Sequence, residues 1–164
     1  MAFMGDDLER ARTLLEEGLT VAQRQGNRMG IAMSHHTVAQ VARLEGRYGD
    51  AAEHYREALR FGHQLGDAGG LSEPLQGLAA VQIATGDAER GVRLLAANAA
   101  IRERLGGGPP PEWLRLGDPL AQARQRLGDE AYDRAWNAGL EMSVDDAVAD
   151  ALATNAASGP TSAN

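Results

Sequence analysis

Four histidines are the side chains of this sequence that could act as metal ligands or proton carriers. His35 and His36 are adjacent, so on a helix they point about 100° apart, while His54 and His63 lie nine residues from each other. No pair has the spacing of a helical ligand couple such as His-Glu-x-x-His. We therefore expect no metal site, with His35 between two helices and the others on the surface or in a groove.

Two further features suggest chemistry but favour a structural interpretation. The glycines at 106–108 resemble a phosphate-binding loop, yet they follow a helical pattern, precede three prolines and have no lysine to accompany them. The acidic pairs at 6–7 and 145–146 lie at predicted helix starts, where the helix dipole favours negative charge. No spacing places two carboxylates in one cleft for acid–base work. The sequence predicts no catalytic residue, no cofactor and no enzyme activity.

The composition excludes several classes of function. The chain has 164 residues, a net charge of −7 and no cysteine, and all 16 basic residues are arginine. This length suits one domain, and the acidic balance argues against a direct nucleic-acid partner, which would need clustered cationic side chains. Without lysine there is no Walker-type loop or Schiff-base amine. Without cysteine there is no disulfide or thiolate nucleophile.

The N-terminus carries no targeting signal that we can identify. Residues 1–7 have neither the basic lead nor the apolar core of a signal peptide, and no later stretch approaches the length of a membrane span. We expect a cytoplasmic protein with no membrane partner.

A repeat of forty residues organises the elements that must position these side chains. Ala11, Ala51 and Gly91 are in register, and so are the helix-ending segments at 25–27, 65–67 and 105–107. A fixed period of this size indicates a solenoid of helical pairs. Apolar residues at three- and four-residue spacing predict helices over 6–24, 29–44, 48–64, 70–85 and 87–105.

The domain boundaries follow from this pattern. Residues 1–105 read as the repeats, made of the second helix of one pair and two full pairs, and 106–117 as a Gly/Pro linker. Residues 118–153 read as a C-terminal helical cap, in which Ser143 and Asp146 suggest a capping box. Residues 154–164 have the composition of a disordered tail.

One repeat carries a recognisable motif, consisting of Gly46, Tyr48, Ala51, Tyr55 and Ala58, with a partial match at Gly86, Gly91 and Leu95. It resembles the tetratricopeptide repeat in a lengthened, forty-residue form. The early aromatic of that motif is replaced by His35 or Leu75, and the closing proline is absent. The resemblance implies an all-α fold, a tetratricopeptide-like solenoid of helical hairpins wound as a right-handed superhelix, with a C-terminal helical cap.

The C-terminal half has a resemblance of its own. Segments 94–106, 127–139 and 142–148 resemble the end of the repeat region in LuxR-type and related signal-transduction ATPases of bacteria. In that family the repeats form a sensory or partner-binding arm. The resemblance implies a non-enzymatic scaffold for protein–protein contacts, the arm of an ATP-dependent transcriptional regulator. Residues 117–119 depart from the continuous helix expected there.

The surface lined by the first helix of each pair is the predicted partner groove. Its side chains not needed for packing mix polar, flexible and charged groups, as a peptide-binding surface would. They are Met33, His36, Gln40, Arg43, Glu73 and Gln76. The alternative interpretation is an ordinary solvated face.

The first repeat lacks its first helix, which leaves the apolar residues Leu8, Leu15 and Leu19 without the partner that the period requires. This face predicts self-association, a homodimer through the N-terminal helix, or cover by another domain. Two alternatives to the regulator arm remain open. One is a self-standing homodimeric module. The other is a metal or small-ligand binder, or an enzyme, with a site near Trp113, Tyr132 and Trp136.

Overall fold

Helices built on the predicted apolar spacing make up the computed structural model, which describes residues 2–107 and 119–153, with side chains from residue 9 onward. Within these residues the elements are α1 (Ala2–Arg24), α2 (Arg28–Leu44), α3 (Tyr48–Gln64), α4 (Ser72–Thr85), α5 (Ala88–Arg104), α6 (Pro119–Leu127), α7 (Asp129–Leu140) and α8 (Val144–Leu152). The all-helical fold is therefore confirmed. Most of the predicted linker, including Trp113, and the whole predicted tail at 154–164 lie outside the described residues.

A glycine at every twentieth position ends each of the first five helices. Gly26, Gly46, Gly66, Gly86 and Gly106 all have positive φ, between 63° and 106°. The residue after each glycine donates its N–H to the carbonyl five positions earlier, at N–O distances of 2.8 to 3.3 Å. This is the Schellman arrangement, which needs a left-handed residue that glycine adopts without strain. The forty-residue period is thus two helix-plus-turn units of twenty residues.

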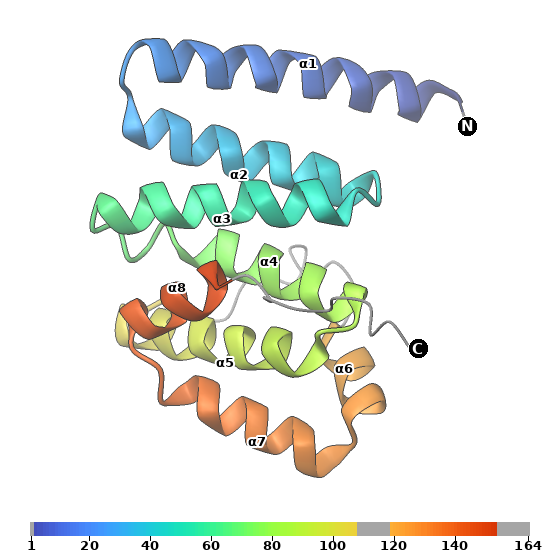
Figure 1. Cartoon of the computed structure of the whole chain (residues 1–164), viewed down its shortest axis with the longest axis vertical. Coiled ribbons are helices and arrows are strands. Elements are labelled where there is room, and N and C mark those ends of the chain that lie inside the picture. Colours follow the sequence, from blue (N-terminus) through green and yellow to red (C-terminus); the bar gives the residue numbers. More distant parts are fainter. Residues whose placement is uncertain (1, 108–118, 154–164) are drawn as a thin grey trace, which may run out of the picture.

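The helices stack in sequence as antiparallel neighbours, forming a tetratricopeptide-like helical solenoid (Figure 1). The pairs α2–α3 and α4–α5 approach closely through small residues: Ala39, Ala51 and Ala79 are fully buried. A Cβ atom on Gly91 would lie 2.7 Å from the Ala79 carbonyl oxygen, so α5 approaches α4 more closely there than any larger residue allows.

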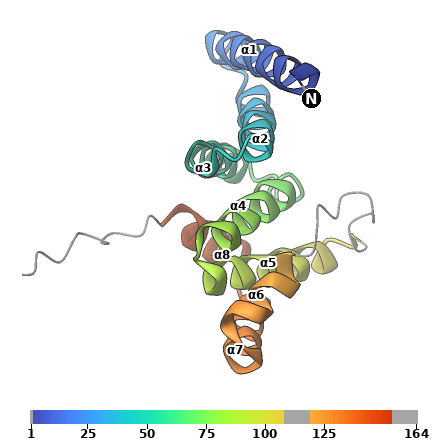
Figure 2. The same ribbon diagram turned by 90° about the vertical axis from the view of Figure 1, so that its right-hand side faces the viewer.

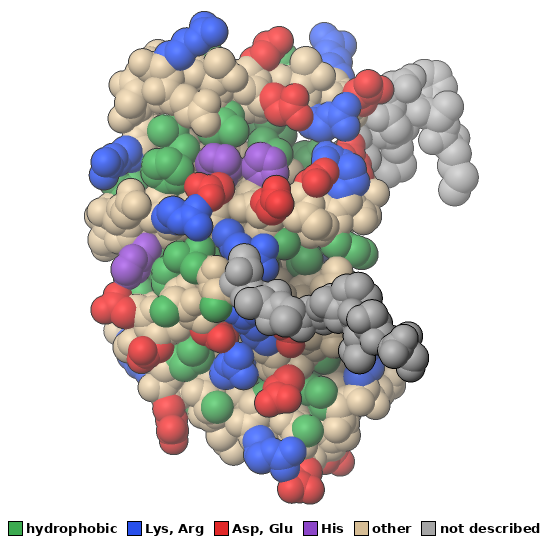
Figure 3. Space-filling model, viewed as in Figure 1, with side chains coloured by type: hydrophobic (Ala, Val, Ile, Leu, Met, Phe, Trp, Pro, Cys, Tyr) green, Lys and Arg blue, Asp and Glu red, His purple; other side chains and the backbone are tan. Residues whose placement is uncertain are grey.

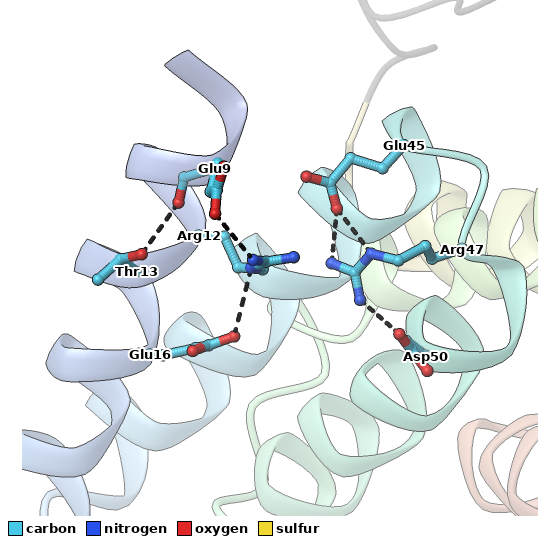
Figure 4. A network of polar contacts seen from close by, with 7 residues as sticks. All are labelled: Glu9, Arg12, Thr13, Glu16, Glu45, Arg47 and Asp50. Atoms are coloured by element: carbon cyan, nitrogen blue, oxygen red, sulfur yellow. Dashed lines mark hydrogen bonds and ion pairs between the residues drawn. The ribbon is translucent and has the colours of Figure 1, made fainter. Parts of the chain in front are cut away.

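The turn between α2 and α3 is fixed by charge. Arg47 pairs with Glu45, at 2.6 Å between Nη2 and Oε2, and also with Asp50 in the first turn of α3 (Figure 4). An acidic residue there also complements the helix dipole. The arginine therefore joins the end of one helix to the start of the next.

The last helices fold back onto the repeats. Gly139 lets α7 lie against α5, since a Cβ at that position would be 2.7 Å from the Ala96 Cβ. The helix α8 lies on the same side of the stack as α3 (Figure 2) and buries Ala147, Val148 and Ala151 in the core that the repeats share.

Polar groups fix α8 in this place. Ser143 and Asp146 form the predicted capping box at its N-terminus, with reciprocal hydrogen bonds of 3.0 and 3.2 Å. Near its C-terminus, Asp150 accepts two hydrogen bonds from Arg93, at 3.0 and 3.2 Å, and Arg90 donates to the Ala153 carbonyl at 2.6 Å. Cations are favoured at this end of a helix.

Among the helices in the described part of the chain, none combines the length and the apolar character that crossing a membrane requires.

Candidate protein-binding face

The candidate site is the surface of α2 and α4, called here the first-helix face. It consists of Met33, His36, Gln40, Arg43, Glu73 and Gln76. Met33 is 64% exposed and Glu73 is also exposed, while the other four side chains are half-buried. The face therefore offers one exposed apolar side chain and one exposed carboxylate beside half-buried polar groups.

His36 and Glu73 join the two repeats across this face. The Nε2 atom of His36 lies 3.2 Å from Glu73 Oε2, so a side chain of α2 contacts one of α4. Burial lowers the pKa of His36, and the Glu73 carboxylate partly opposes that shift. The lowered pKa favours the neutral imidazole, and the buried Nδ1 has no hydrogen-bond partner in the described part of the chain.

Arg43 is anchored by the core beneath the face. Burial raises the pKa of Tyr55, and the neighbouring Arg43 guanidinium partly opposes that shift. The Tyr55 ring also lies 5.9 Å from the His36 ring, centroid to centroid. One buried tyrosine therefore lies close to two members of the face.

The remaining members are not joined to these contacts. In the residues that the structure describes, no hydrogen bond or ion pair links the side chains of Met33, Gln40 or Gln76 to other members of the face. They share the same helices but stay available to a ligand.

Two histidines form a contact that the sequence analysis did not foresee. His35 is 9% exposed, as expected for an inter-helix position, and its Nδ1 lies 2.9 Å from Nδ1 of His54. It also stacks on Phe61 at 6.2 Å. Burial and the neighbouring His54 lower the pKa of His35, while Glu57 raises it. The sequence feature that could have predicted this pair is the turn at Gly46, because it places α2 and α3 side by side.

Histidine side chains lie among apolar ones on the side of the molecule drawn in Figure 3. His63 contacts Asp145 of α8, at 2.7 Å between Nε2 and Oδ1. Over the described range, no three histidine, aspartate or glutamate side chains come together as metal ligands.

The predicted self-association residues lie in α1. Leu15 and Leu19 are half-buried, and Leu8 falls among the residues whose side chains the structure does not describe. The exposed apolar side chains of this helix are instead Leu14, at 59%, and Val21, at 49%.

The aromatic residues proposed for a site near the cap stack on each other. Tyr132 and Trp136 of α7 have ring centroids 6.2 Å apart and nearly parallel planes, and the Arg124 guanidinium lies 4.6 Å above the Tyr132 ring. Trp113, the third residue of that alternative, lies outside the described residues, so a site there stays a prediction.

The family model for the tetratricopeptide repeat matches residues 2–61, which cover α1, α2 and most of α3. This segment is therefore similar to tetratricopeptide repeats. Such repeats generally mediate protein–protein interaction. The first-helix face thus begins on a helix inside the tetratricopeptide segment, α2, and continues onto α4.

Curated relatives extend this similarity. Over 116 residues, 68% of this chain, the sequence is 33% identical to proteins of Mycobacterium bovis and Mycobacterium tuberculosis that are named as candidate HTH-type transcriptional regulators. The aligned segment is 13% of the length of each regulator, so the chain corresponds to a small part of these relatives. The predicted resemblance to regulator repeat regions is confirmed. No solved structure matches the chain significantly.

Proposed function

We propose that this chain is a non-enzymatic scaffold that binds a protein or peptide segment along the first-helix face. The observation that carries the proposal is the His36–Glu73 contact, because it joins the first helices of two successive repeats into one continuous surface. Around it lie an exposed methionine and half-buried amides that can read a peptide backbone.

The charges of the face indicate the chemistry of its ligand. Arg43 contributes a half-buried cation to the face, which suits a carboxylate of the bound segment. Met33 offers a flexible apolar contact, as methionine does on surfaces that accept peptides. The ligand class is therefore a peptide with an acidic residue followed or preceded by an apolar one.

We further propose that the scaffold is the partner- or signal-sensing arm of an ATP-dependent bacterial transcriptional regulator that works in the cytoplasm. The support is the 33% identity to candidate HTH-type regulators, together with the match of residues 2–61 of this chain to the tetratricopeptide family model. ATP dependence comes only from the family resemblance of the C-terminal segments described above.

Selection from a phage-displayed random peptide library tests the binding proposal. The selected peptides should be acidic and apolar, and their affinity for Arg43→Ala should fall by about tenfold, the loss typical of a charged contact. Arg24→Ala is the matched control, since Arg24 is an exposed arginine of α1 away from the face. The proposal would be contradicted if the library yields no binders. It would also be contradicted if the selected peptides bind Arg43→Ala and Met33→Ala with the same affinity as the unmodified chain.

A further inference from the structure

The exposed apolar stripe of α1 consists of Leu14, Gly18 and Val21, called here the outer stripe. Leu14 and Val21 are 59% and 49% exposed, and a Cβ built on Gly18 meets nothing within 4 Å. The spacing of four and three residues places all three on one side of the helix. Gly18 therefore leaves a shallow depression in the stripe, between the side chains of Leu14 and Val21.

The forty-residue period shows what fills the same hole elsewhere in this chain. Adding forty to the outer stripe gives His54, Ala58 and Phe61 of α3. There, His35 of α2 lies between the two large side chains, with ring centroids 5.1 Å from His54 and 6.2 Å from Phe61, and Ala58 is buried beneath. A surface of this pattern therefore packs against a helix that places one large side chain over the small residue.

We propose that a second copy of this chain covers the outer stripe, through antiparallel packing of α1 on α1. The stripe carries both the hole and the side chain that fits it, because Leu14 lies one turn from Gly18. A twofold axis then lets Leu14 of each copy enter the hole at Gly18 of the other. Such a self-complementary patch is what an isologous dimer requires, and glycine allows the two backbones to approach closely.

Charges close to the stripe do not oppose this occupant. The chain carries a net charge of −7, but residues 9–24, which surround the stripe, hold three glutamates (9, 16, 17) and three arginines (10, 12, 24), which sum to zero. The whole of α1 also contains Asp6 and Asp7 and so carries a net charge of −2, from five acidic residues and three arginines. Arg10 and Glu17 lie on one edge of the stripe, and the twofold axis keeps that edge on the same side in both copies.

The other charges of α1 are already engaged away from the stripe. Arg12 pairs with Glu9 at 3.9 Å and with Glu16 at 3.8 Å, and Thr13 donates to the Glu9 carbonyl (Figure 4). At 100° per residue, Arg12 and Glu16 lie on the side of the helix opposite to Leu14 and Val21. Dimerisation through the outer stripe leaves this network, and the first-helix face of α2 and α4, unchanged.

Sedimentation velocity over a wide concentration range, with light scattering for the mass, tests the proposal. The unmodified full chain should form a species of twice the mass of one chain. Leu14→Glu should weaken the dimer by at least about tenfold, because it places charge in the dry centre of the interface. Gly18→Leu should do the same by filling the hole, while keeping or raising helix stability, since glycine is a poor helix former.

Gln23→Glu is the control, since it adds the same charge at an exposed position of α1 outside the stripe. Its dimer should be unchanged, and circular dichroism should show all variants folded. A chain that stays monomeric at every concentration would overturn the proposal, and so would a dimer that survives both Leu14→Glu and Gly18→Leu. Peptide binding to the first-helix face is measured separately, so failure of either proposal is visible independently of the other.

Discussion

The ring of Tyr55 on α3 lies directly against Gly77 on α4, where a Cβ atom would come within 2.6 Å of the tyrosine hydroxyl oxygen. Tyr55 is 1% exposed and belongs to the motif by which the repeat was recognised. The tyrosine of one repeat therefore needs a glycine in the next. The same ring lies 5.9 Å from the His36 ring, so packing between repeats and the geometry of the first-helix face involve one residue.

Replacing Gly77 by alanine should loosen the contact between α3 and α4. The buried Tyr55 ring has no space to move away, so we expect a loss of about 1–3 kcal/mol in the free energy of unfolding, as over-packing typically costs. Urea denaturation followed by circular dichroism measures it. Gly49→Ala, in open space on α3, is the control and should be neutral or slightly stabilising. Equal stability of the two variants would show that the ring is not confined.

The docking of α7 on α5 should be equally sensitive at Gly139. A Cβ there collides with the Arg93 backbone carbonyl, which cannot rotate away as a side chain could. We expect Gly139→Ala to release α7, so that its amides exchange with solvent faster while those of α2 keep their rates. Hydrogen exchange read by mass spectrometry provides both values from one sample. Unchanged exchange in α7 would mean that the two helices are further apart than described.

The ion pair between Arg93 and Asp150 should hold α8 in place. Asp150 is bound in two hydrogen bonds by Arg93 and also approaches the buried Arg90, at 3.6 Å. Asp150→Ala leaves these arginines without their shared anion, and we expect a loss of about 1–3 kcal/mol in the free energy of unfolding. The exposed pair of Arg134 with Glu130 provides the comparison, since Arg134→Ala should change stability by less than about 0.5 kcal/mol. Similar effects of both variants would refute a special role for Asp150.

Stability should fall as the pH drops through the range in which histidine titrates. The pKa values of His35 and His36 are lowered in the folded chain, chiefly by burial. Below their unfolded value of about 6.5 the unfolded state binds more protons, so the free energy of unfolding decreases from there until the folded pKa is reached. Above that value these histidines contribute no slope.

Thermal unfolding between about pH 5 and pH 8 measures this effect. The midpoint should be level near the upper end and decline below pH 6.5, and His35→Gln should flatten the decline, because it removes a histidine whose burial disfavours protonation in the folded chain. A variant with the same slope as the unmodified chain would assign the pH dependence to other groups.

Much of this fold follows from local sequence signals. The glycines at intervals of twenty residues end the first five helices, and the bounds of α3 agree with the prediction because both its ends are set by such turns. Predicted and observed starts of α4 differ by two residues. The Asp67 side chain accepts a hydrogen bond from the N–H of Gly70, which holds that residue in the preceding turn.

Long-range contacts had no such signal. Arg56 donates to the Ala151 carbonyl across 95 positions, and nothing in the spacing of either residue indicates it. Period alone also misjudges burial: Arg90 is in register with the exposed residues Arg10 and Asp50, yet it is 7% exposed, because α8 covers it. On α1 the prediction identified the stripe of Leu15 and Leu19, which lies beside the more exposed stripe of Leu14 and Val21.

The central claim is that α2 and α4 bind a peptide together. Hydrogen exchange of the unmodified chain, with and without a peptide selected as described above, tests it most directly. Bound peptide should slow exchange in both α2 and α4, and this protection should disappear in Arg43→Ala. Protection confined to α7 or α8, or to one repeat alone, would contradict the account, because the His36–Glu73 contact would then not mark a continuous binding surface.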